Sequence, residues 1–319
     1  MDQQNSLYNR AVRRFCRLTF PFWERLGFHI VPIHFYQPIP DSRTLSPSLS
    51  ERTSDLVGID INDSFQLDLL ERFEKQFRAE YDAFPRSATN DQTQFHLDNT
   101  AFSTIDAEIL YCMIRQFHPR RIIEIGSGNS TLLSAQALRE NARRGEVSGE
   151  LVSIEPYADN VLQRGVPGLT ELIQSKVQQV PLDRFSALEA NDILFIDSSH
   201  ISQVDSDVNY EFLEILPRLK PGVIVHVHDI YLPREYDLAM FNRHKTFGLN
   251  EQYVLHAFLA FNKEFEILWA SNYMCVTHPK EMARAFRSYG EHLSDAVPGS
   301  FWIRRISGES GDGVTLGAS

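Results

Sequence analysis

The stretch RIIEIGSGNSTLL, residues 121–133, constrains the fold more than any other part of the chain. Its apolar start is typical of a buried strand, the Gly-Ser-Gly turn interrupts that strand, and the residues after the turn favour a helix. This order places Gly126 and Gly128 at the carboxyl end of a strand, where missing side chains let a ligand approach the backbone. Glycine pairs also occur in turns that bind nothing, so this stretch alone leaves ligand binding open.

Apolar segments that suit strands and segments that suit helices alternate after this turn. Strands are expected at 151–154, 177–181, 193–196, 223–227, 265–270 and 301–306. Helices are expected at 103–117, 208–219, 251–261 and 280–289, and partly over 161–176. Such alternation predicts an α/β fold with a mostly parallel sheet covered by helices on both faces.

The composition excludes several classes of protein. A net charge of −11 argues against a nucleic-acid surface, which needs clustered Lys and Arg, and leaves a cationic or neutral small ligand open. The three cysteines lie far apart and imply neither a disulfide framework nor a cysteine metal site, so a cytoplasmic location is expected. The basic amphipathic segment 4–26 suits either a membrane surface or packing on the domain; we favour packing and expect no membrane partner.

Polar residues follow the expected strands at the points where ligands bind in open α/β sheets. Glu155 ends the strand after the glycine turn, where a carboxylate can accept hydrogen bonds from both hydroxyls of a ribose. Its alternative role is to cap the segment that follows. Asp197, His200 and the pair His228-Asp229 end the next strands. A phosphate chain would want a Walker lysine, and none follows the glycines.

These motifs resemble a known family. Glu124-Ile-Gly-Ser-Gly-Asn-Ser, Ser153-Ile-Glu155-Pro and Phe195-Ile-Asp197-Ser-Ser-His200 are similar to class I S-adenosylmethionine-dependent methyltransferases, and most to bacterial small-molecule O-methyltransferases of the macrolide-sugar type. The resemblance implies a doubly wound, mostly parallel seven-stranded sheet, the Rossmann-like methyltransferase fold, with an antiparallel last strand. It also implies that S-adenosylmethionine is held by Glu124, Gly126, Ser127, Gly128 and Ser130, which face its methionine part, and by Glu155 at its ribose.

The resemblance also gives an expected domain organisation. Residues 95–306 would form the methyltransferase domain, and residues 1–94 a helical and irregular extension that is a candidate substrate lid. The tail 307–319 has too few apolar residues to fold, so we expect it to be disordered.

The resemblance further assigns catalytic and metal roles. In metal-dependent relatives, the aspartate after the fourth strand and two acidic residues after the fifth bind magnesium, and a nearby histidine is the base. Asp197, His200 and Asp229 match these positions, whereas His228 replaces an acidic residue. Imidazole suits softer metals better than magnesium, so the predicted site of Asp197, His228 and Asp229 would hold Mg or a softer metal. A metal-free site in which Asp229 orients a histidine is the alternative.

The predicted reaction is methyl transfer from S-adenosylmethionine to an oxygen of a small molecule, such as a sugar or natural-product hydroxyl. His200 would be the base and Asp197 its catalytic partner. Two other functions stay open: a metal-dependent hydrolase or oxygenase that uses His226, His228 and the aspartates, or a non-catalytic ligand-binding protein of the same fold. Neither the acceptor nor a homo-oligomeric state can be derived from these residues.

Overall fold

The computed structural model describes residues 3–33, 39–46, 48–236, 249–290 and 297–306. These divide into two compact units, one within Met1–Leu49 and the other within Ser50–Tyr236 and Leu249–Ser319. The division lies near residue 50, whereas the domain boundary expected from the sequence is at residue 94. Residues 50–94 therefore group with the sheet, and the predicted tail 307–319 lies outside the described residues.

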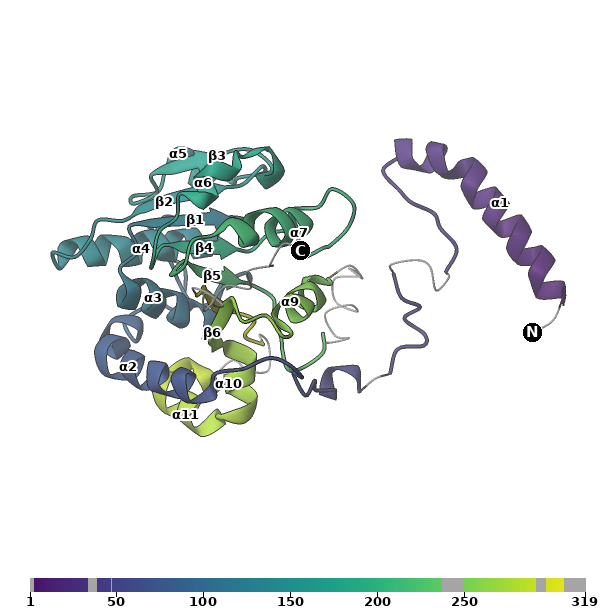
Figure 1. The fold of residues 1–319 in the computed structure, drawn as a ribbon. Coiled ribbons are helices and arrows are strands. Elements are labelled where there is room, and N and C mark those ends of the chain that lie inside the picture. The colour runs from purple at the N-terminus through teal and green to yellow at the C-terminus, as the bar shows by residue number, and fades with distance from the viewer. Residues whose placement is uncertain (1–2, 34–38, 47, 237–248, 291–296, 307–319) are drawn as a thin grey trace, which may run out of the picture. The chain divides into compact units, whose positions relative to one another are not determined.

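The described part of the larger unit contains a seven-stranded sheet in the order β3-β2-β1-β4-β5-β7-β6 (Figure 1). The strands are β1 (Arg121–Ile125), β2 (Glu150–Ile154), β3 (Glu171–Ile173), β4 (Ile193–Ile196), β5 (Ile224–Val227), β6 (Phe265–Ala270) and β7 (Phe301–Arg305). The first five pair in parallel, and β7 runs antiparallel to both β5 and β6. This order confirms the predicted sheet and its antiparallel last strand.

One strand was wrongly placed from the sequence. The expected strand at 177–181 is a 3-10 turn, η2 (Val177–Gln179), and the edge strand β3 lies in the segment expected to be partly helical. Edge strands are short and only half-buried, as the burial of Glu171, Leu172 and Ile173 shows, so their apolar pattern is weak.

Helices cover both faces of the sheet because neighbouring strand residues point in opposite directions. Ile122 packs with α2 (Asp63–Tyr81), α3 (Asp106–Phe117) and α4 (Asn129–Arg143), whereas Ile123 packs on the other face. That second face is covered by α6 (Leu182–Ser186), α7 (Asp207–Tyr210), the π-helical turn η3 (Glu211–Ile215), η4 (Leu216–Arg218) and α9 (Glu251–Leu259). The remaining described elements are η1 (Leu49–Glu51), α5 (Asn160–Arg164), α10 (Ser271–Thr277), α11 (Pro279–Ala285) and η5 (Arg287–Gly290).

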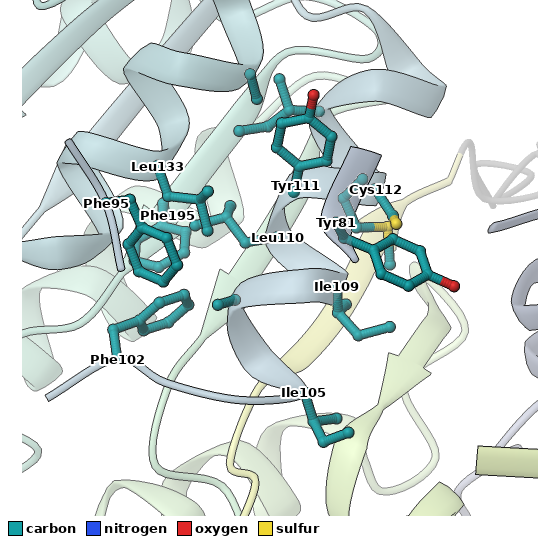
Figure 2. Packing of buried hydrophobic residues seen from close by; sticks show 14 of the residues in the cluster. Tyr81, Phe95, Phe102, Ile105, Ile109, Leu110, Tyr111, Cys112, Leu133 and Phe195 are labelled. Atoms are coloured by element: carbon teal, nitrogen blue, oxygen red, sulfur yellow. The ribbon is translucent and has the colours of Figure 1, made fainter. Parts of the chain in front are cut away.

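Helix α3 is the centre of the first core. Figure 2 shows Ile109, Leu110 and Cys112 of this helix among buried residues from other elements. Phe102, just before the helix, packs edge-on against Phe195 of β4 with ring centroids 5.8 Å apart. Such contacts fix the start of α3 against the carboxyl half of β4, close to the end where the predicted site lies.

The smaller unit contains helix α1 (Gln3–Arg25). Its apolar side chains Phe15, Leu18 and Phe22 are exposed, while Cys16 is buried. No helix in the described ranges is long and apolar enough to cross a membrane.

The carboxyl ends of four neighbouring strands are level. Ile125 of β1 pairs with Ile154 of β2 and Ile196 of β4, and Ile196 pairs with Val227 of β5. The next residues on these strands are Gly126, Glu155, Asp197 and His228. Three backbone bonds extend this ladder: Gly126 N–H to Ile154 O, Asp197 N–H to Ile125 O, and His228 N–H to Ile196 O. The register therefore brings the predicted site residues to one edge of the sheet, as parallel pairing requires.

Gly126 is required by the close approach of β1 to the end of β4. Its φ is +88°, in the left-handed region, and a Cβ built there would collide with the backbone carbonyl of Asp197. Gly128 differs, because a Cβ at this position would meet nothing within 4 Å.

We expect Gly126→Ala to destabilise the protein, because the new methyl group must displace backbone and the residue must keep a left-handed conformation. Overpacking and left-handed strain together predict a loss of about 2–4 kcal/mol in the free energy of unfolding. Denaturant unfolding would measure it. The matched control is Gly128→Ala, which should stay within about 1 kcal/mol of wild type; equal losses in the two variants would contradict this account.

Candidate functional site

The glycine turn presents two buried oxygens that have no partner within the described residues. Glu124 is fully buried; Ser130 Oγ donates a hydrogen bond to its Oε1 at 2.6 Å, and its Oε2 accepts none. The hydroxyl of Ser127 is also buried without a partner. Burial raises the pKa of Glu124 to about 8, so the carboxyl is largely protonated at neutral pH. Unpartnered buried polar atoms are uncommon, and these two are available to bind polar groups of a ligand.

Glu155 stands beside this turn at the end of β2. It is partly exposed, and its Oε1 accepts a hydrogen bond of 2.7 Å from the backbone N–H of Tyr157. The cap of the following helix α5 is Asp159, which accepts from the N–H groups of Val161 and Leu162. Glu155 therefore orders the turn but is not the helix cap, and it stays accessible to a ligand.

These features fit the cofactor that the sequence predicts. The open space over Gly128 admits a ligand to the backbone, and the acceptor atom of Glu124 suits an ammonium group. Glu155 follows the neighbouring strand, where it can reach hydroxyl groups.

His200 lies between three carboxylates. Its Nε2 is 3.2 Å from Oδ1 of Asp197 and 3.5 Å from Oδ2 of Asp229, and its Nδ1 is 2.8 Å from Oε2 of Glu251. Burial acts to lower the pKa of His200, but the hydrogen bonds to Asp197 and Glu251 outweigh it and raise that pKa well above its usual value. The surrounding carboxylates therefore favour the protonated imidazole in the resting site.

His228 is placed in the same way by a different set of carboxylates. Its Nδ1 lies 3.4 Å from Oδ1 of Asp197 and 3.6 Å from Oδ1 of Asp229, while its Nε2 lies 3.5 Å from Oδ2 of Asp106. Burial acts to lower the pKa of His228, but Asp197 and Asp229 outweigh it and raise that pKa well above normal. His228 is thus a second buried cation in this cluster.

Asp197 is the carboxylate that both rings share. Burial acts to raise its pKa, but the neighbouring His228 and His200 hold it well below the usual value. We refer to Asp106, Asp197, Asp229, Glu251, His200 and His228 as the strand-end cluster.

The cluster does not support the predicted metal site of Asp197, His228 and Asp229. Both aspartates are paired with imidazole nitrogens, and because these carboxylates raise the pKa of His228, a metal ion would have to displace a proton from this ring. Within the part of the chain that the structure describes, no group of three or more His, Cys, Asp or Glu residues is arranged to hold a metal ion.

His226 is a core residue. It is fully buried, stacks on Phe195 with ring centroids 3.9 Å apart, and its Nε2 lies 2.9 Å from the hydroxyl of Ser300. Burial holds its pKa well below normal, so the ring is neutral. The alternative metal site built on His226 and His228 is therefore not supported by the described residues.

Two residues in the loops after β4 and β5 adopt left-handed backbone conformations. His200 has φ +59° and Asp229 has φ +54°, which are uncommon for residues other than glycine. Asp229 is held by the hydroxyl of Tyr231, which donates a hydrogen bond of 2.8 Å to its Oδ1. Local strain of this kind persists where surrounding contacts fix the loop, and it is typical of functional sites.

The sequence analysis missed Asp106 and Glu251. Asp106 is the first residue of α3; its carboxylate accepts hydrogen bonds from the N–H groups of Gly299 and Ser300. Glu251 is the first residue of α9. Both helices lead into strands of the sheet, so their first turns lie at the carboxyl edge. An acidic residue in the first turn of a helix that precedes a parallel strand is the signal that identifies them.

Comparison with known proteins agrees with this architecture. Residues 123–230, which contain the glycine turn, Glu155, Asp197, His200 and His228-Asp229, match a family model described as a methyltransferase domain. The sheet order with an antiparallel β7 is that of the fold predicted for this class. The chain contains a methyltransferase domain. The match does not identify the methyl acceptor.

Individual relatives are distant or uncharacterised. The methyltransferase is 34% identical to an uncharacterised protein of Archaeoglobus fulgidus over 168 residues, which are 50% of this chain and 74% of the relative. It is similar to an apo structure of CmcI with 11% identity and a TM-score of 0.37, covering 72% of this chain and 84% of that one. It is also similar to a putative protein-L-isoaspartate O-methyltransferase from Plasmodium falciparum in complex with S-adenosyl-L-homocysteine, with 14% identity and a TM-score of 0.28. This match covers 51% of this chain and 83% of that one. Both TM-scores are low, so neither structure bears on the acceptor.

Glu124→Gln should make the methyltransferase less sensitive to rising pH. The folded-state pKa of about 8 lies above the ordinary 4.5, so the stability contributed by the protonated carboxyl is complete below pH 4.5 and is lost as pH rises to about 8. The loss is up to about 1.4 kcal/mol for each pH unit in that window. The uncharged glutamine does not lose stability in this way. The free energy of unfolding of the variant, measured by denaturant unfolding, should therefore rise relative to that of wild type between pH 5 and 8.

Glu108→Gln is the matched control, because burial also raises the pKa of Glu108, to about 7. Both variants should gain stability at pH 8, but only Glu124→Gln should weaken the binding of S-adenosylmethionine. A Glu124→Gln curve parallel to wild type over the whole range would contradict the assigned pKa.

Proposed function

We propose that the protein transfers the methyl group of S-adenosylmethionine to an oxygen atom of a small molecule, with His200 as the base. The observation that carries this proposal is the placement of His200 Nε2. It lies 3.2 Å from Oδ1 of Asp197, the residue that follows β4 next to the glycine turn at the carboxyl edge of the sheet. A proton acceptor at this edge is what a hydroxyl substrate requires.

The cofactor would be held by the glycine turn and Glu155. Glu124 Oε2 and the Ser127 hydroxyl are the unpartnered polar atoms there, and Gly128 leaves room for close approach. When bound, S-adenosylmethionine supplies a methyl group on a positively charged sulfur. The chain's own contribution is to orient the acceptor oxygen in line with that methyl carbon, which supplies much of the acceleration.

His200 would take the acceptor's proton. A lone pair of the acceptor oxygen forms the bond to the methyl carbon. The carbon–sulfur bond breaks at the same time, and the electron pair of that bond stays on sulfur. The O–H proton moves to Nε2, so the imidazole must be neutral when the acceptor binds. Asp197 and Asp229 then stabilise the imidazolium that forms, because they already flank this nitrogen.

Cofactor binding is tested by thermal shift with S-adenosylmethionine and with S-adenosylhomocysteine. Either ligand should raise the Tm of wild-type protein, because a ligand that binds only the folded state stabilises it. Mg²⁺ or Zn²⁺ alone should give no comparable rise, since the strand-end carboxylates are paired with imidazoles. Wild-type protein without a shift for either cofactor form would falsify the proposed function.

Glu155→Ala should abolish the cofactor-induced rise in Tm while the protein keeps its fold, because the ribose loses its carboxylate partner. Calorimetric titration would give the affinity. Asp159→Ala is the control: it removes a carboxylate from the same loop and should cost about 1 kcal/mol of stability as a lost helix cap. The control should retain the ligand-induced shift, so the two variants separate cofactor binding from loop order.

His200→Ala should lower turnover by about 10²–10⁴-fold, and His200→Gln should not restore it. The assay uses methyl-labelled S-adenosylmethionine with a panel of sugar and phenolic hydroxyl compounds. Since the carboxylates raise the pKa of His200, the wild-type rate should rise with pH through a midpoint above 6.5. The same rate and pH profile in His200→Ala would place the base elsewhere, with His228 as the next residue to test.

A further inference from the structure

Glu251 lies behind His200, on the side away from the other carboxylates that contact this ring. The Glu251 side chain is fully buried, whereas Asp197 and Asp229, which face Nε2, are 26% and 25% exposed. The two nitrogens of His200 therefore differ in surroundings: Nδ1 faces a sealed carboxylate and Nε2 faces the accessible edge of the sheet. Only the Nε2 side is open to a substrate.

The backbone around Glu251 also fixes the loop that carries His200. The N–H groups of Asn250 and Glu251 both donate to the carbonyl of His200, at 3.0 and 3.3 Å. The Asn250 side chain bonds the backbone of Ser202 in both directions, accepting from its N–H and donating to its carbonyl. The left-handed φ of His200 is thus held by the first turn of α9.

The next residue of α9 connects the same turn to the second loop of the site. Gln252 Oε1 accepts a hydrogen bond of 2.6 Å from Tyr231 N–H, and its Nε2 donates to the carbonyl of Arg234 at 3.0 Å. Tyr231 in turn holds Asp229. The residues at the start of α9 therefore hydrogen-bond to both loops of the strand-end cluster, the one after β4 and the one after β5.

We propose that Glu251 is the positioning residue of His200. It keeps a proton on Nδ1 and fixes the ring so that Nε2 faces the acceptor and serves as the proton-accepting atom. The assignment rests on the proposed function, because it gives His200 the role of base. Glu251 itself contacts neither substrate nor cofactor in this arrangement.

A purely structural role does not explain why a charged side chain is buried at position 251. A fully buried carboxylate is expensive, and burial raises the pKa of Glu251 even though His200 acts to lower it. Its second oxygen, Oε1, has no partner among the described residues. A glutamine or an apolar residue would fill this space at lower cost in stability. Among the described residues, the negative charge of Glu251 acts on the ring of His200, whose Nδ1 lies 2.8 Å from Glu251 Oε2.

The first experiment reads the ring directly and needs no acceptor. In full-length protein labelled with ¹⁵N-histidine, the Nδ1–H of His200, assigned with His200→Gln, should give a downfield, slowly exchanging proton resonance, because a buried carboxylate accepts it. Glu251→Gln should remove or shift that resonance, and Glu251→Asp should partly restore it. Glu211→Gln is the matched control, because Glu211 is equally buried near this loop but accepts its hydrogen bond from Ser198.

The second experiment separates kcat from KM for whichever hydroxyl compound the labelled-cofactor panel identifies. Glu251→Gln should lower kcat by about 10–100-fold, less than His200→Ala, because the imidazole remains but is no longer held. KM and the affinity for S-adenosylmethionine should change less than about 3-fold, and Glu251→Asp should recover part of kcat. Glu211→Gln should stay within about 3-fold of wild type.

The outcomes are distinguishable. A wild-type His200 without a protected Nδ1–H, or a Glu251→Gln variant with unchanged kcat, overturns the positioning role even if methyl transfer is demonstrated. A Glu211→Gln variant that loses kcat as Glu251→Gln does also overturns it, because the effect is then one of buried charge in general. A protected Nδ1–H that depends on Glu251, in a protein that binds no S-adenosylmethionine, refutes the proposed function while the pairing stands.

Discussion

The charge of Asp197 at the end of β4 is the constraint on which the rest of the site depends. The residue follows β4, between β1 and β5, so its position is set by the sheet, and its backbone N–H bonds Ile125. A carboxylate that is largely removed from water needs a compensating positive charge. His200 and His228 supply that compensation. Each histidine then needs a carboxylate on its other nitrogen, and Glu251 and Asp106 meet this need.

This arrangement also sets the charge of the site. Four carboxylates surround two imidazoles in the strand-end cluster, so the edge of the sheet carries more negative than positive groups even with both rings protonated. Such a field favours a cationic ligand and opposes a phosphate chain. The same preference follows from the glycine turn, where Glu124 supplies an acceptor and no lysine is present. A positively charged sulfonium cofactor is compatible with both halves of the site.

The sheet and half of the site were predictable from the sequence because both depend on local patterns. Gly126, Glu155 and Asp197 directly follow apolar strands, and parallel register makes such positions neighbours whatever the loops between them do. Asp106 and Glu251 could not be placed in this way. They lie far from Asp197 in sequence, carry no motif, and reach the site because helices α3 and α9 begin at the edge where the parallel strands end. The edge strand β3 was misplaced because a half-buried strand has little apolar pattern to detect.

His228 stands where the resemblance led us to expect an acidic residue, and it changes the charge of the strand-end cluster. Here the ring of His228 lies between Asp106, Asp197 and Asp229 and provides the positive charge from the chain itself. The second ring nitrogen of His228 faces Asp106, which also accepts hydrogen bonds from the backbone just before β7. His228 therefore connects α3, the segment before β7 and the ends of β4 and β5.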